Sequence, residues 1–201
     1  SIYGSTKIEY SQYSTSGHLC YDSFIQAINQ YPMSLEKPMP AIFIGHGSPD
    51  NAFEDNEFSR EWRRIATTFE KPAGILVISA HWVTPGATLV TGMAQPETIH
   101  DFYGFPDAYS EFHYPAPGAP DLARRIAKLV TTVPVQTDES WGLDHGAWSV
   151  LTHLYPEADI PVIQMSIDSR LSAQEHWLLG QELGALRDEG ILILGSGNIV
   201  H

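Results

Sequence analysis

The 201-residue sequence has one cysteine, Cys20, which excludes a framework of internal disulfides and suits a reducing compartment such as the cytoplasm. Long apolar runs are also missing: the longest, such as residues 75–78 and 191–194, are far shorter than a transmembrane helix. Basic residues are scarce, since 11 Lys and Arg stand against 24 Asp and Glu and the formal net charge is −13. Such a surface repels phosphate groups and anionic lipid, which argues against nucleic-acid and membrane partners.

Hydrophobic residues make up 43% of the sequence and charged residues 17%, which excludes disorder along the whole chain. The length suffices for one well-buried domain but not for two of ordinary size. Residues 1–32 differ from the rest, because they are rich in Ser, Tyr and Gln and lack the basic start and apolar core of a signal peptide. We expect a flexible N-terminal extension at 1–32 and a domain at 33–201. The alternative is an N-terminal arm that packs on the domain.

Short apolar runs rich in β-branched residues predict the strands. They are continuous rather than alternating, which is typical of strands covered on both faces: Ala41–Ile44, 74–79, 161–167 and 191–194. Patterns of helical period or helix-start residues lie between them: 58–69, a segment from Pro120, 147–155, and a segment from the capping box at 172–175 that ends near Gly190. The alternation predicts a single α/β domain with a largely parallel sheet and helices on both faces.

A long connection between Thr91 and Pro117 is rich in proline and aromatic residues. Long connections of this kind inside compact domains are usually functional. We expect either a lid over a binding site or a structural flap that covers a sheet edge.

Three histidines follow predicted strands: His46, His81 and His201. Ligands of open α/β sheets bind beyond the carboxyl ends of the strands, where these side chains can converge. With nine histidines and one cysteine in the chain, imidazole nitrogen rather than thiolate would hold a metal. The sequence therefore predicts a metal site at this edge of the sheet.

Other histidines have less definite settings. His145 precedes the predicted helix 147–155 and is either a proton shuttle or a residue that makes a local helix-start bond. His100 and His113 lie on the aromatic connection, where either would touch a substrate. We take His153 and His176, in predicted helices, and His18, in the extension, as structural.

Several blocks of the sequence resemble class III extradiol ring-cleavage dioxygenases, in the 4,5-DOPA dioxygenase branch. They occur in order from about Met33 to His201 and comprise residues 40–49, 79–82, 99–102, 114–118, 141–146 and 196–201. The resemblance implies a single divalent metal ion, Fe(II) for activity or Zn(II) as isolated, with His46 and His81 as ligands. His201 would be a ligand or the acid–base residue, and His145 would lie near the dioxygen.

The same resemblance implies the substrates, a catechol such as 3,4-dihydroxyphenylalanine and O2, with ring opening at the 4,5 bond. His100, Phe102 and Tyr114 would contact the flat substrate. In the family a further ligand comes from a C-terminal region, and we expect that part to be absent from this chain. Two other functions stay open: a zinc-dependent hydrolase and a non-catalytic, Memo-like binding protein on the same fold. The oligomeric state is not indicated.

Overall fold

A computed structural model describes residues 37–198. The predicted extension at 1–32 and His201 therefore lie outside the described residues. In chain order the elements are β1 (Ala41–Ile44), η1 (Pro49–Ala52), α2 (Glu57–Ala66), β2 (Gly74–Thr84), β3 (Thr88–Thr91), α3 (Asp107–Ser110), α4 (Pro120–Leu129), β4 (Val135–Asp138), α5 (His145–Leu154), β5 (Val162–Asp168), α6 (Ala173–Leu183), η2 (Gly184–Glu189) and β6 (Ile191–Ser196).

The described strands form one sheet of six strands in the order β1-β6-β2-β5-β3-β4. β1, β6, β2 and β5 are parallel to one another, whereas β3 pairs with β5 in the antiparallel sense and with β4 in the parallel sense. The predicted α/β domain with a largely parallel sheet is confirmed. Because β1, β6 and β2 are parallel neighbours, their carboxyl ends share one edge of the sheet.

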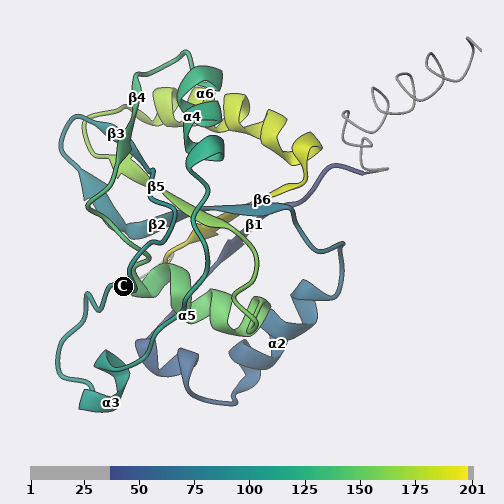
Figure 1. The fold of residues 1–201 in the computed structure, drawn as a ribbon, viewed down its shortest axis with the longest axis vertical. Coiled ribbons are helices and arrows are strands. Elements are labelled where there is room, and N and C mark those ends of the chain that lie inside the picture. Colours follow the sequence, from purple (N-terminus) through teal and green to yellow (C-terminus); the bar gives the residue numbers. More distant parts are fainter. Residues whose placement is uncertain (1–36, 199–201) are drawn as a thin grey trace, which may run out of the picture. The chain divides into compact units, whose positions relative to one another are not determined.

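Helices cover both faces of this sheet, as Figure 1 shows: α4 and α6 lie on one side, and α2 and α5 on the other. Each side has its own apolar cluster. Trp148 and Leu151 of α5 pack with Ile75 and Leu194 of the sheet in one of them. Both faces of the central strands are thus buried, which explains their continuous apolar sequences.

The helix starts follow from the side chains that cap them. α2 begins with a capping box of Asn56 and Ser59, and α6 with the predicted box of Ser172 and Glu175. Pro120 opens α4 as predicted. Asp144 caps α5, which begins at His145, two residues earlier than expected.

Some bounds differ from those expected. β2 continues to Thr84, so His81 lies within the strand rather than after it, and its pairing with β5 changes register between Ile78 and Val83. α6 ends at Leu183 and passes into η2, and Gly190 then ends that helix with a φ of 82°. Between residues 37 and 198 no helix combines the length and apolar character needed to cross a membrane.

Candidate metal centre

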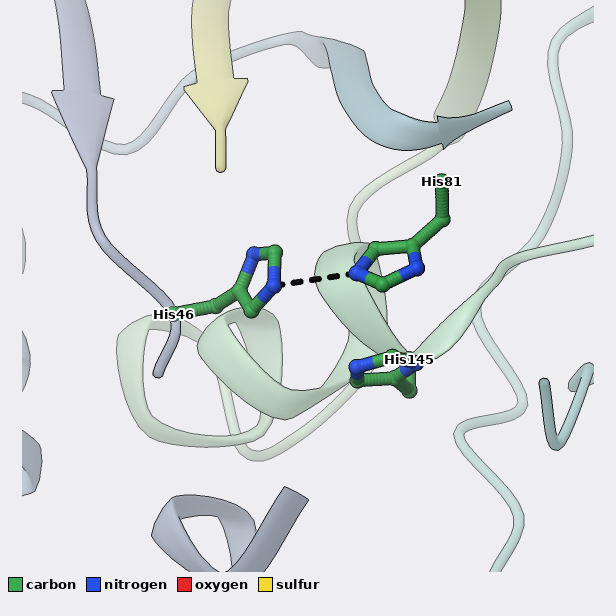
Figure 2. A group of neighbouring side chains, drawn as sticks. All are labelled: His46, His81 and His145. Atoms are coloured by element: carbon green, nitrogen blue, oxygen red, sulfur yellow. Dashed lines mark hydrogen bonds between the residues drawn. The ribbon is translucent and has the colours of Figure 1, made fainter. Parts of the chain in front are cut away.

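Three histidines converge at the carboxyl edge of the sheet. His46 lies in the loop after β1, His81 on the last part of β2, and His145 is the first residue of α5 (Figure 2). One ring nitrogen of each lies within 4.8 Å of the others. His46 and His145 are buried, while His81 is partly exposed. The structure thus brings His46 and His81 together as the sequence led us to expect, and it places His145, expected near the dioxygen, in the same group.

The carboxylate of Asp101 contacts the Nδ1 atoms of two of these rings, those of His81 and His145. Its Oδ2 lies 3.1 Å from Nδ1 of His81, and its Oδ1 lies 2.9 Å from Nδ1 of His145. The same Oδ1 accepts a hydrogen bond from the backbone N–H of His145 at 2.9 Å. Since a carboxylate accepts hydrogen bonds, both Nδ1 atoms carry protons, and both Nε2 atoms carry lone pairs in the neutral rings.

A hydroxyl group orients the third ring. Ser196, the last residue of β6, donates a hydrogen bond to the carbonyl oxygen of Gly146, and its Oγ lies 2.9 Å from Nδ1 of His46. Because the hydroxyl proton is used by the carbonyl, Nδ1 of His46 is the donor in the second bond. The Nε2 lone pair of His46 is then on the side of the ring that faces His81.

The donor atoms suit a metal ion. The Nε2 atoms of His46 and His81 are 3.0 Å apart (Figure 2). Two nitrogen ligands about 2.0–2.1 Å from one ion are ~2.9–3.4 Å apart for bond angles between a right angle and the tetrahedral angle. Without an ion, one of the two nitrogens would have to carry a proton for the same contact to be favourable. Imidazole nitrogen is a ligand for Zn, Fe, Cu and Ni, so these residues fit a transition metal rather than Ca²⁺ or Mg²⁺.

The charge of Asp101 controls the electrostatics of the group. Burial alone would raise the pKa of Asp101, but the hydrogen bonds from His145 and His81 outweigh it and hold that pKa well below its ordinary value. The hydrogen bond to Asp101 raises the pKa of His81, against a smaller opposing effect of burial. Asp101 is therefore an anion that stabilises positive charge at the rings, whether a proton or a metal ion supplies it.

Aromatic side chains from the long connection stand next to the histidines. The ring of Phe102 meets the ring of His145 edge-on, with centroids 5.6 Å apart, and also contacts Trp148 at 6.1 Å. His100 contacts Phe102 at 5.9 Å, and its Nε2 donates to the carbonyl of Phe112. Segment 91–117 thus brings an aromatic wall to the site, and it also contains the single turn of α3.

Tyr114 takes a different place. It is 2% exposed, belongs to the apolar cluster beside α5, and donates a hydrogen bond from its hydroxyl to the carbonyl of Tyr155 at 2.7 Å. Burial raises the pKa of its phenol above the ordinary range. His113 contacts the ring of His100 at 6.2 Å rather than the three converging histidines. Of the three expected substrate contacts, Phe102 lies beside His145, His100 contacts Phe102, and Tyr114 packs into the core.

Sequence reasoning did not single out the two residues that orient the rings, Asp101 and Ser196. Each lies in a block that was recognised for its histidine, next to His100 in one case and before His201 in the other. A chemical argument could have indicated them. A metal-bound imidazole needs an acceptor for the proton on its other nitrogen, and a carboxylate or hydroxyl close in sequence to a candidate histidine can be that acceptor.

Comparison with known proteins agrees with this geometry. The family described as the catalytic LigB subunit of aromatic ring-opening dioxygenase matches residues 38–201. A protein of Escherichia coli (strain K12) named 4,5-DOPA dioxygenase extradiol is 54% identical over 164 residues, which cover 81% of this chain and 60% of that protein. A protein of the same name from Beta vulgaris is 47% identical over 167 residues, covering 80% of this chain and 62% of that protein.

Among solved structures, the crystal structure of an uncharacterized protein from Escherichia coli K12 matches with a TM-score of 0.68 and 48% identity. The match covers 81% of this chain and 61% of that one. The chain therefore spans about 60% of the length of the curated relatives that it matches.

Proposed function

The chain belongs to the LigB family of aromatic ring-opening dioxygenases, and from this membership we propose that it is a metal-dependent extradiol dioxygenase. The observation that carries the proposal is the arrangement of the three imidazoles. Asp101 and Ser196 hold the Nδ1 atoms of the three rings, so the Nε2 atoms carry the lone pairs at the carboxyl edge of the sheet. Such a set of neutral nitrogens beside an aromatic wall suits a metal ion and a flat aromatic substrate.

His46 and His81 are the proposed ligands. Their Nε2 atoms have the separation that two ligands of one ion require, and their other nitrogens are held by Ser196 and Asp101. A bound Fe(II) ion would supply the electron transfer between a catechol and dioxygen, whereas Zn(II) in its place would supply charge but no redox chemistry. The role of His201, as third ligand or as acid–base residue, stays a prediction from the sequence.

His145 is the proposed acid–base residue. Its Nδ1–H is held by Asp101, which leaves Nε2 to accept a proton from a catechol hydroxyl. The imidazolium that forms would face the carboxylate of Asp101, as in other His–Asp pairs that act as general bases. Because the backbone N–H of His145 also bonds to Asp101, the ring and the carboxylate would keep their relative position during the transfer.

The proposed substrate is a catechol such as 3,4-dihydroxyphenylalanine, opened at the 4,5 bond. The curated relatives named above carry that activity in their names, and the aromatic wall supports it. Phe102 offers a ring beside His145 on which a flat substrate can rest, and it would exclude water from the reacting atoms. His100 would border the same space through its contact with Phe102.

The test is oxygen uptake on a panel of catechols after anaerobic removal of metal and reloading with Fe(II) or Zn(II). We expect turnover with Fe(II) only, ring-opened product from 3,4-dihydroxyphenylalanine, loss of both metal and activity in His46→Ala, and loss of activity with retained metal in His145→Ala. His176→Ala, on α6, is the matched histidine control. Hydrolysis without oxygen would indicate the zinc hydrolase, and metal binding without any turnover would indicate a binding protein. Equal metal loss in both site variants would make His145 a ligand instead.

A further inference from the structure

A buried polar group lies directly behind the histidines, formed by Ser79 of β2, Asp144 before α5, and Gln164 of β5. We propose that this Ser79–Asp144–Gln164 clamp is a positioning device for the metal centre, in which Asp144 sets the place of His145, and through the first turn of α5 that of His46, relative to His81. The inference rests on the proposed metal-dependent function. It concerns a residue that does not itself touch metal or substrate.

The contacts within the clamp are complete and reciprocal. Oδ1 of Asp144 accepts from Oγ of Ser79 at 2.7 Å and from the backbone N–H of Ala147 at 3.1 Å. Oδ2 accepts from Nε2 of Gln164 at 2.8 Å, while Oε1 of Gln164 accepts from the backbone N–H of Asp144 at 2.9 Å. All three side chains of the clamp are 0% exposed. The clamp therefore ties the residue before His145 to two adjacent strands of the sheet.

The first turn of α5 transmits this position to the other rings. His81 follows Ser79 by two residues on β2, and its backbone N–H donates to Oγ of Ser79 at 3.2 Å. Gly146 carries the carbonyl that accepts from Ser196, which in turn accepts from His46. A Cβ atom added to Gly146 would lie 2.6 Å from Oγ of Ser79 and 2.9 Å from Cδ2 of His81. The turn is thus packed against the site with no room for a methyl group.

Helix capping alone does not account for Asp144. A cap needs one acceptor for a backbone N–H, which serine or asparagine supplies at less cost than a fully buried carboxylate. The donors to this carboxylate are a hydroxyl, an amide and a backbone N–H, and none of them carries a compensating charge. The two side-chain bonds, from Ser79 and Gln164, go beyond what a helix start requires. What they determine is the distance between α5 and the two strands.

The direction of the bonds gives a specific experiment. In Asp144→Asn the new amide meets Nε2 of Gln164, so two donors face each other, although the cap to Ala147 survives. In the double variant Asp144→Asn/Gln164→Glu the new amide donates to the new carboxylate, whose other oxygen still accepts the backbone N–H of residue 144. Every hydrogen bond and the total charge are then restored, and only the bond between the side chains of residues 144 and 164 reverses its direction. Ser172→Ala, which removes the cap of α6, is the control for a loss of stability away from the site.

Zn(II) or Co(II) affinity, measured by competition with a chelator, is the main readout, with melting of the metal-free protein and kcat and KM beside it. We expect Asp144→Asn to lose about 10–100-fold in metal affinity and the double variant to recover most of it, while Ser172→Ala lowers only the melting temperature. Wild-type affinity in Asp144→Asn, or a double variant as weak as the single one, would overturn the inference. Metal affinity is measured without turnover, so the two proposals can fail separately. If the variants show the expected order of affinities but the wild type cleaves no catechol, the proposed function is refuted and the positioning role stands.

Discussion

Replacing Asp101 by asparagine should weaken metal binding by acting on the protons of the two rings that it holds. The asparagine oxygen can still accept from the N–H and Nδ1–H of His145, which leaves the amide group facing Nδ1 of His81. A donor at this place favours the His81 tautomer whose proton is on Nε2. That proton occupies the lone pair that the metal needs.

The size of the effect follows from the bond that must be broken. To bind metal, His81 has to return its proton to Nδ1, opposite the amide, which forfeits a hydrogen bond and leaves two partly buried donors facing each other at a cost of about 1–3 kcal/mol. At 1.4 kcal/mol for each factor of ten, this is a loss of ~5–150-fold in affinity. The loss of the negative charge at Asp101 acts in the same direction, because the anion stabilises a bound cation.

The assay is a competitive titration of the metal-free protein with Zn(II) against a chelator of known affinity, together with a thermal melt. Asp168→Asn is the matched control, since Asp168 is 6% exposed and its Oδ1 accepts only from the backbone N–H groups of Gly86 and Arg170, which an amide oxygen can replace. We expect a reduced metal affinity in Asp101→Asn and an unchanged metal affinity in the control. Unchanged affinity in Asp101→Asn, in a protein that melts like the wild type, would refute the assignment of the ring protons.

Three further predictions test other parts of the structure. Gly146→Ala should destabilise the fold by about 1–3 kcal/mol because its methyl group overlaps Ser79. Gly180→Ala, at an exposed position of α6 with open space around it, should instead stabilise the fold by about 0.5–1 kcal/mol. Denaturant unfolding of both variants measures these changes. Ser196→Ala should lower metal affinity about 10–100-fold by removing the hydroxyl that accepts from Nδ1 of His46, and a titration that matches the wild type would contradict it. Burial lowers the pKa of His153 below 6.5, so the unfolded chain binds the proton more readily and stability should fall as the pH drops below about 6.5. His153→Gln should lack this pH-dependent loss of stability. Unfolding free energies of the wild type and the variant, measured near pH 7.5 and 5.5, would show the difference.

Burial made much of the fold predictable. Strands covered on both faces must be apolar throughout, and the start of β2 follows from that rule. The bounds of β1 were also correct, although β1 is an edge strand in which Ala41 and Phe43 are exposed. The four-residue strands β3 and β4 were not predicted from apolar runs, because they lie toward the far edge of the sheet and contain threonine and other polar residues. The end of β2 was missed because a polar residue, His81, interrupts the apolar run without ending the strand.

The site also contains residues that the sequence could predict and residues that it could not. The approach of His46 to His81 could be anticipated, since the ends of parallel strands share an edge whatever the distance along the chain. The closeness of His145 was implied by the family resemblance but not by strand order, because it depends on packing at Gly146 that only the three-dimensional structure reveals. Asp101 lies in an irregular segment without a period, so no pattern predicted where its carboxylate would point.

The order of the strands has a consequence for how the protein is made. Within the described part of the chain β1 pairs only with β6, and the hydrogen bond between His46 and Ser196 joins residues 150 positions apart. During synthesis β1 must therefore wait, unpaired, until the ribosome has released the chain through Ser196. The half of the centre that His46 provides is assembled last, so an ion held by both His46 and His81 would bind only after β6 has been made. We therefore expect metal loading to follow folding, so the supply of metal would set the fraction of metal-loaded protein.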